Sequence, residues 1–99
     1  MHIVVNRFSL TENVDWTILE SKVNQLQAQV AGERADFHGV SLVRIGQTEA
    51  ILLVLFETRE ALDDISKNIA APWFTEHVKP YLAGPVDRQV GEIVAGVLG

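Results

Sequence analysis

Hydrophobic residues recur along this chain in two spacings, one typical of β-strands and one typical of α-helices. Strand-like patterns occupy four segments, at residues 2–10, 37–46, 50–56 and 86–98. The segment 50–56 (AILLVLF) is apolar throughout, which is typical of a strand covered on both faces. A short polar connection joins it to the preceding strand, so these two strands form a predicted hairpin.

Two further segments have helical spacing. The first is predicted over residues 14–31, with Asn13 as its N-cap and Gly32 as its C-cap. Its apolar stripe repeats every three or four residues and consists of Trp16, Leu19, Val23, Leu26 and Val30. The second helix can begin after Thr58, and we expect Pro72 to stop it and to open a short extra helix.

The order strand–helix–strand–strand–helix–strand is the ferredoxin-like split β-α-β pattern of the α+β class. Right-handed crossovers place both helices on one face of a four-stranded antiparallel sheet and leave the other face bare. The third strand carries Ile51, Leu53 and Leu55 on one face and three more large apolar residues on the other. Whichever set lies away from the helices forms an apolar patch that is unusual on a monomer, so we expect a homodimer.

Composition narrows the function classes. With 99 residues, the chain is expected to be one domain spanning residues 1–99. Its net charge is −5, from 8 Lys and Arg against 13 Asp and Glu, and no basic cluster occurs, so nucleic acid and anionic membranes are not expected partners. Cysteine is absent, which excludes disulfides and Cys-ligated metals. Neither a signal peptide nor an apolar run of about 18 residues is present, and we expect a cytoplasmic protein.

Three segments carry a resemblance to a known family: VVNRFSL in the first strand, LVLFETREALDDI before and within the second helix, and PWFTEHVKPYL before the last strand. With this element order, the chain resembles the dimeric α+β barrel superfamily and, within it, the antibiotic-biosynthesis-monooxygenase-like family. The resemblance implies a pocket between the helices and the sheet of each protomer. It also implies one of three activities: cofactor-free oxygenation of electron-rich aromatic substrates, haem degradation, or no known activity.

The haem-degrading branch of that family has an Asn on the first strand, a Trp in the second helix and a His further along. Asn6 matches the Asn position, and His77 falls near the His position. At the Trp position the second helix offers Leu62 and Ile65, and Trp73 comes only after the helix is expected to end. This departure disfavours haem degradation, so haem is the less favoured cofactor alternative to none, and no metal site is predicted.

The candidate site residues have two readings each. Asn6 is a poor strand former, so it is either a hydrogen-bond donor to a ligand or a polar residue near a strand end. Trp73, His77 and Tyr81 are spaced by four and share a helical face if the helix continues. They either form an aromatic pocket wall with His77 as axial ligand or proton shuttle, or belong, with Phe74, to an amphipathic helix packed on the core.

Three functions follow from these readings. The first is a cofactor-independent monooxygenase for a phenolic or quinol-like substrate, with Asn6, His77 and Trp73 catalytic and with Phe74 and Tyr81 contacting a small apolar or aromatic ligand. The second is a non-catalytic ligand-binding or assembly module on the same scaffold. Haem degradation is the third.

Overall fold

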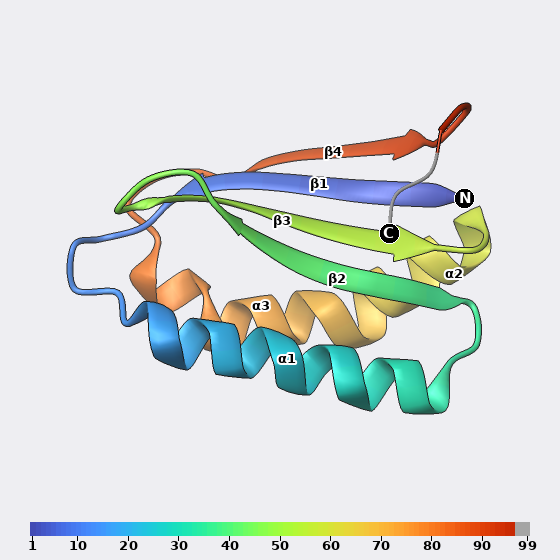
Figure 1. Cartoon of the computed structure of the whole chain (residues 1–99), viewed down its shortest axis with the longest axis horizontal. Helices are drawn as coiled ribbons and strands as arrows, with labels where there is room; N and C mark the ends of the chain where they lie inside the picture. The colour runs from blue at the N-terminus through green and yellow to red at the C-terminus, as the bar shows by residue number, and fades with distance from the viewer. Residues whose placement is uncertain (97–99) are drawn as a thin grey trace.

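The computed structural model describes residues 1–96 and contains the elements in the predicted order (Figure 1). The second helical segment is divided into three parts by its backbone geometry, with a π-helical turn (η1) between two α-helices, and a 3-10 turn (η2) follows. The elements are β1 His2–Ser9, α1 Trp16–Glu33, β2 Phe37–Arg44, β3 Glu49–Phe56, α2 Arg59–Ile65, η1 Ser66–Ala70, α3 Ala71–His77, η2 Lys79–Tyr81 and β4 Asp87–Glu92.

The sheet has the strand order β2-β3-β1-β4, and every neighbouring pair is antiparallel. Helices α1 and α3 run along the same face of this sheet (Figure 1). The ferredoxin-like α+β class predicted from the sequence is therefore confirmed. Within residues 1–96, no helix combines the length and the apolar character that a bilayer span requires.

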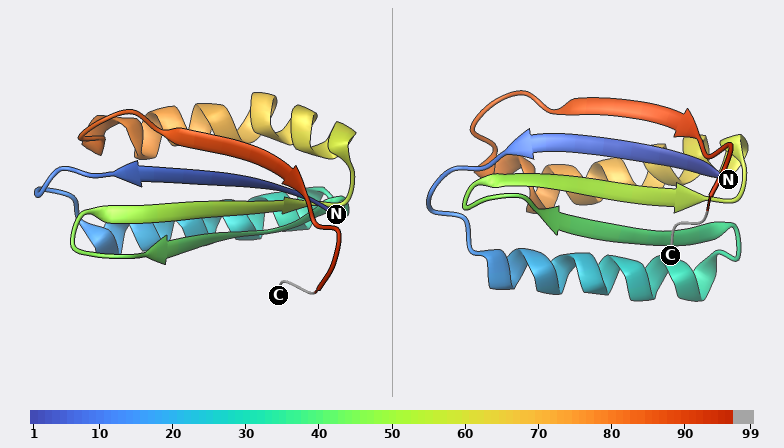
Figure 2. Two further views of the ribbon diagram at one scale, coloured as in Figure 1. Left: turned by 90° about the horizontal axis from the view of Figure 1, so that it is seen from above. Right: turned by 45° about the horizontal axis from the view of Figure 1, so that its top comes forward.

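Strand β3 separates a covered face of the sheet from an open one. Its even-numbered residues, from Ala50 to Phe56, are buried against the helices. Ile51, Leu53 and Leu55 are half-buried on the opposite face, and no helix of the described chain lies over that face (Figure 2). We call the surface formed by these three residues and their cross-strand neighbours Val5 and Val43 the open face. The sequence predicted two alternating sets, and the fold decides which one is covered.

The start and end of α1 differ from the prediction. The carboxylate of Asp15, rather than the amide of Asn13, accepts a hydrogen bond from the Ile18 N–H at 3.2 Å, and the helix begins at Trp16. Gly32 lies within the last turn, and Arg34 is the C-cap residue. Asn and Asp are almost equally good N-caps, so two such residues so close in sequence cannot be ranked by residue type alone.

The prediction that Pro72 stops the second helix is wrong, whereas Thr58 caps the helix as expected. The Ala71 N–H donates to the Ser66 carbonyl, five residues back, which makes the turn before the proline a π-turn. Pro72 then occupies the first turn of α3, where an N–H group is not needed, and the predicted short extra helix that opens at this proline is confirmed. The chain therefore stays helical past Pro72, and it leaves the α-helix only after His77.

The last strand is shorter than predicted. Strand β4 ends at Glu92, where it pairs with His2 near the start of β1. One more hydrogen bond follows, from the Ile93 N–H to the Met1 carbonyl, and strand pairing does not continue past it within the described residues. The predicted strand residues 93–96 are therefore not part of the sheet, and residues 97 and 98 of that prediction lie outside the described residues.

Candidate functional site

A cavity of about 590 Å³ lies between the covered face of the sheet and the helical segment α2–η1–α3. This volume is within the range of about 300–1,000 Å³ typical of small-molecule sites. Most of its walls are apolar, with contributions from Val4, Leu26, Leu52, Val54, Trp73 and Phe74. The space is open and is not filled by the aromatic side chains around it.

Asn6 is the polar side chain that β1 directs into this cavity. Its neighbours on the same face of β1, Val4 and Phe8, are both buried in the core. The Asn6 amide nitrogen reaches the Leu52 carbonyl only at 3.5 Å, so this side chain has no short hydrogen bond of its own. A ligand oxygen in the cavity can therefore accept an N–H from Asn6.

Trp73 and Phe74 form the aromatic part of the lining. Phe74 packs edge to face on Phe8, with ring centroids 5.5 Å apart, which holds it against the core. Trp73 packs against the His77 ring, also at 5.5 Å. His77 and Tyr81 are not among the lining residues, and Tyr81 lies in η2 beyond the end of α3. Of the five predicted site residues, the structure thus brings Asn6, Trp73 and Phe74 together.

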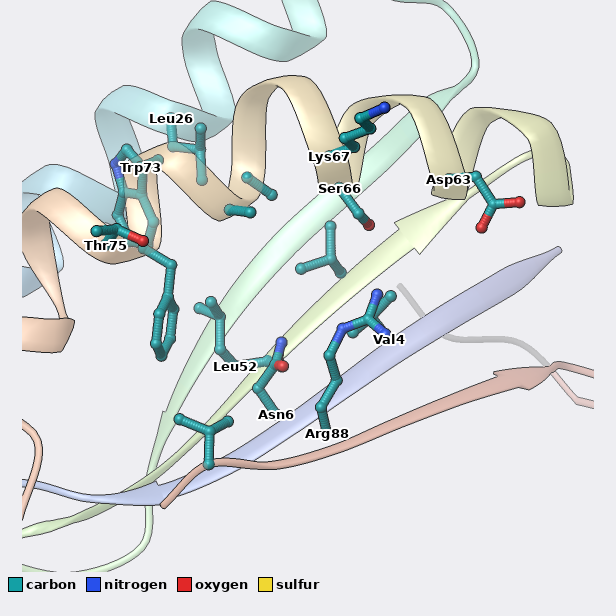
Figure 3. A pocket seen from close by; sticks show the side chains of 15 residues that line it. Val4, Asn6, Leu26, Leu52, Asp63, Ser66, Lys67, Trp73, Thr75 and Arg88 are labelled. Carbon is teal, nitrogen blue, oxygen red and sulfur yellow. The ribbon is translucent and has the colours of Figure 1, made fainter. Parts of the chain in front are cut away.

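Sequence reasoning did not single out the polar residues that β4 and the second helical segment add to the lining. Arg88 of β4 is paired in register with Asn6, so the two side chains lie beside each other on the sheet (Figure 3). Ser66 points from η1 toward the sheet, and Asp63 of α2 lies farther along the same helical wall of the cavity. The available signal was the alternation along the last strand, but it has meaning only once the register with β1 is known.

The lining does not fit a haem. Haem iron is held by an axial imidazole, thiolate, thioether or phenolate, and none of the described lining residues carries one of these groups. Within residues 1–96, no group of three or more His, Cys, Asp or Glu is placed to hold a metal ion. The chemistry available in the cavity is therefore that of an amide, a guanidinium, an ammonium, a carboxylate, two hydroxyls and aromatic rings.

Neither a family model nor a curated protein sequence matches this chain. Solved structures do. The cofactor-independent oxygenase SnoaB from Streptomyces nogalater superposes with a TM-score of 0.72 at 11% identity, over 97% of this chain and 95% of its own. A candidate antibiotic biosynthesis monooxygenase from Caulobacter crescentus gives a TM-score of 0.76 at 17% identity, over 95% and 90%. This chain has the antibiotic-biosynthesis-monooxygenase-like fold.

The resemblance predicted from the sequence is thus confirmed at the level of the fold. The same fold also carries a different activity. MhuD from Mycobacterium tuberculosis, a heme-degrader with two hemes bound in its active site, superposes with a TM-score of 0.68 at 18% identity, over 98% of this chain and 99% of its own. One antibiotic-biosynthesis-monooxygenase-like fold therefore supports more than one chemistry, and the function must be argued from the cavity.

Proposed function

We propose that this protein is a cofactor-independent monooxygenase that oxidises a small phenolic or quinol-like aromatic substrate. The observation that carries the proposal is the apolar cavity of about 590 Å³, with Asn6 on its floor and Trp73 and Phe74 on its wall. The cofactor-independent oxygenase SnoaB shares the fold, which supports the assignment of the reaction class.

The proposed reaction balances without a bound redox group. A phenol and O₂ give the corresponding quinone and water. One oxygen atom of O₂ becomes bonded to a ring carbon, the other leaves as water, and all the electrons come from the substrate. The apolar walls exclude water from the reactive intermediates. Trp73 and Phe74 stack on the substrate ring, and Asn6 donates an N–H to the oxygen on which negative charge develops.

The test is oxygen consumption by the purified protein with a panel of phenols, naphthol among them, in the presence of a metal chelator. Equal amounts of O₂ consumed and quinone formed are expected. Asn6→Ala should reduce the rate by about 10²–10³-fold, the usual effect of losing one donor to a developing oxyanion. Asn24→Ala, at an exposed position of α1 that does not line this cavity, is the matched control and should leave the rate unchanged. Equal rates in wild type and Asn6→Ala would refute the role of this amide.

The proposal gives His77 a positioning role, because its ring packs on Trp73 and is not among the lining residues. His77→Ala should raise the KM more than it lowers the kcat, since it loosens Trp73 without removing a group from the reacting atoms. His77→Phe, which keeps a ring against Trp73, should restore the KM. A kcat that collapses in both variants would instead make His77 a proton carrier.

The proposal includes assembly and location. The protein is a homodimer formed through the open face, and residues 1–99 form one domain in the cytoplasm. Support for the dimer comes from the three large side chains of β3 on the open face, together with Val5 and Val43 beside them in the register. Burying each such side chain contributes roughly 1.5–3 kcal/mol.

The alternative is a non-catalytic ligand-binding or assembly module. Its support is specific: no described lining residue is a His, Cys or Tyr, and the one carboxylate of the described lining, Asp63, is paired with Arg59, so the cavity offers no imidazole, thiol or phenol to accept a proton. The two functions are separated by one pair of measurements. Aromatic ligands that bind in the cavity without any oxygen consumption across the panel would favour the module.

A further inference from the structure

Two of the polar groups of the cavity lie next to each other on its sheet side. Asn6 and Arg88 lie side by side where β1 pairs with β4, and both side chains extend from the sheet toward the helices (Figure 3). Ser66 points toward them from η1 on the opposite wall. Lys67 extends away from the sheet, so the cation that faces this space is Arg88.

Arg88 differs from the other arginines of the chain. Within residues 1–96 it has no hydrogen-bond or ion-pair partner, although one acid, Asp63, also lines the cavity. Asp63 is already paired with Arg59 at 3.2 Å. The other arginines are engaged with Glu49, with Asp36 and Asp64, with the Gly46 carbonyl and with Asp63.

The overall charge of the chain is negative, so it does not explain why a cation lies beside Asn6 in the cavity. The chain carries a net charge of −5. Arg88 is exposed on the edge strand β4, and its guanidinium, which has no acidic partner within residues 1–96, is directed over the apolar walls of the cavity. A guanidinium presents a planar set of N–H donors that matches an anionic oxygen pair, and the neighbouring Asn6 amide adds a further N–H.

We propose that the ligand of this cavity is an aromatic anion, whose carboxylate or ionised phenol oxygen is bound by Arg88 and Asn6. The aromatic ring then lies toward Trp73 and Phe74, at the apolar end of the same cavity. This inference rests on the proposed function for the location and the aromatic character of the ligand. It adds the charge of the substrate and the residue that selects it.

The test is calorimetric binding of paired probes that differ only in charge: naphthoate against naphthamide for a carboxylate, and para-nitrophenolate against para-nitroanisole for an ionised phenol. The anion of at least one pair should bind about tenfold more tightly than its neutral partner, as a charge-assisted hydrogen bond requires. The pair that shows the preference identifies the source of the anionic oxygen.

Arg88→Gln should abolish that preference and leave the affinity for the neutral probe unchanged. Arg7→Gln is the matched control, because Arg7 lies on the opposite face of the neighbouring strand β1 and is paired with Glu49. It should keep the full preference. Far-ultraviolet circular dichroism and the urea midpoint establish that both variants are folded.

Three results would overturn the inference: equal affinity for both members of each pair, a preference that survives in Arg88→Gln, or no binding of any probe at millimolar concentration. Failure of the monooxygenase proposal looks different. If the protein prefers the anion but consumes no oxygen, the anion site is supported and the monooxygenase reaction is refuted. If the protein oxidises phenols without any charge preference, the monooxygenase reaction is supported and the anion site is refuted.

Discussion

Gly39 is the residue at which β2 departs from regular pairing with β3. The register shifts between Phe37 and Gly39, and Gly39 has a φ of +146°, a conformation that L side chains rarely adopt. The extra residue lets Phe37 and Val40, which simple alternation would place on opposite faces, both be buried in the core. A single backbone conformation thus determines which side chains β2 contributes to the core.

Gly39→Ala is therefore expected to destabilise the fold. The alanine must hold a positive φ, at a cost of about 1–3 kcal/mol, whereas its Cβ would be in ordinary van der Waals contact with the Gln27 side-chain oxygen at 3.5 Å, so the strain comes from the backbone. Urea unfolding measures the change. Gly84→Ala is the control, since nothing lies within 4 Å of its Cβ, and it should stay within about 0.5 kcal/mol of wild type. Equal midpoints for the two variants would contradict the strain at Gly39.

At the scale of elements, Arg34 joins three parts of the fold. It follows the end of α1 and donates two hydrogen bonds to Asp36 before β2, at 3.0 and 2.8 Å, and one to Asp64 in α2 at 2.6 Å. The Arg34 guanidinium lowers the pKa of the Asp36 carboxyl and that of the Asp64 carboxyl, and Asn68 adds a further hydrogen bond to Asp64. The two carboxylates raise the pKa of Arg34 in turn.

This cluster predicts a pH dependence of stability. Because the folded pKa values of Asp36 and Asp64 lie below their unfolded values of about 3.9, the stabilisation is complete above that pH and is lost as the pH falls through the folded values. The urea midpoint should therefore fall more steeply in acid for wild type than for Arg34→Gln. The variant should be less stable at neutral pH, and the two curves should converge in acid. Parallel curves would show that the cluster contributes nothing.

At the scale of the whole molecule, the open face is the feature that a single chain leaves unsatisfied. Leu53 lies near its centre, opposite Val5 of β1 and Ser41 of β2. Sedimentation of the wild type at micromolar concentration should show a dimer. Leu53→Glu should sediment as a folded monomer, because two buried carboxylates facing each other across a two-fold interface cost more than the apolar contacts return.

The control for that experiment is Ile18→Glu. Ile18 is a comparably large residue that is 54% exposed on α1, away from the open face, and its substitution should leave the dimer intact. A wild-type protein that sediments as a monomer at micromolar concentration would refute the dimer proposal.

Much of the fold could be read from the sequence because its signals are local. The two-residue period in the strands and the spacing of three and four from Trp16 to Val30 are properties of each segment alone, and both correspond to the observed elements. The capping role of Thr58 is equally local. Asn6 was found for the same reason: an amide among strand-forming residues stands out without any knowledge of its neighbours.

Tertiary structure decided what depends on neighbours. Pairing with β1 ends β4 at Glu92, and the π-turn before Pro72 carries the helix onward to Trp73. Arg88 could be assigned to the site only once the register of β4 with β1 placed it opposite Asn6. The two residues are more than eighty positions apart in the sequence. The sequence by itself thus determined the elements and their apolar faces, since periodicity is local. The composition of the cavity was decided by strand register, which depends on pairing between distant segments.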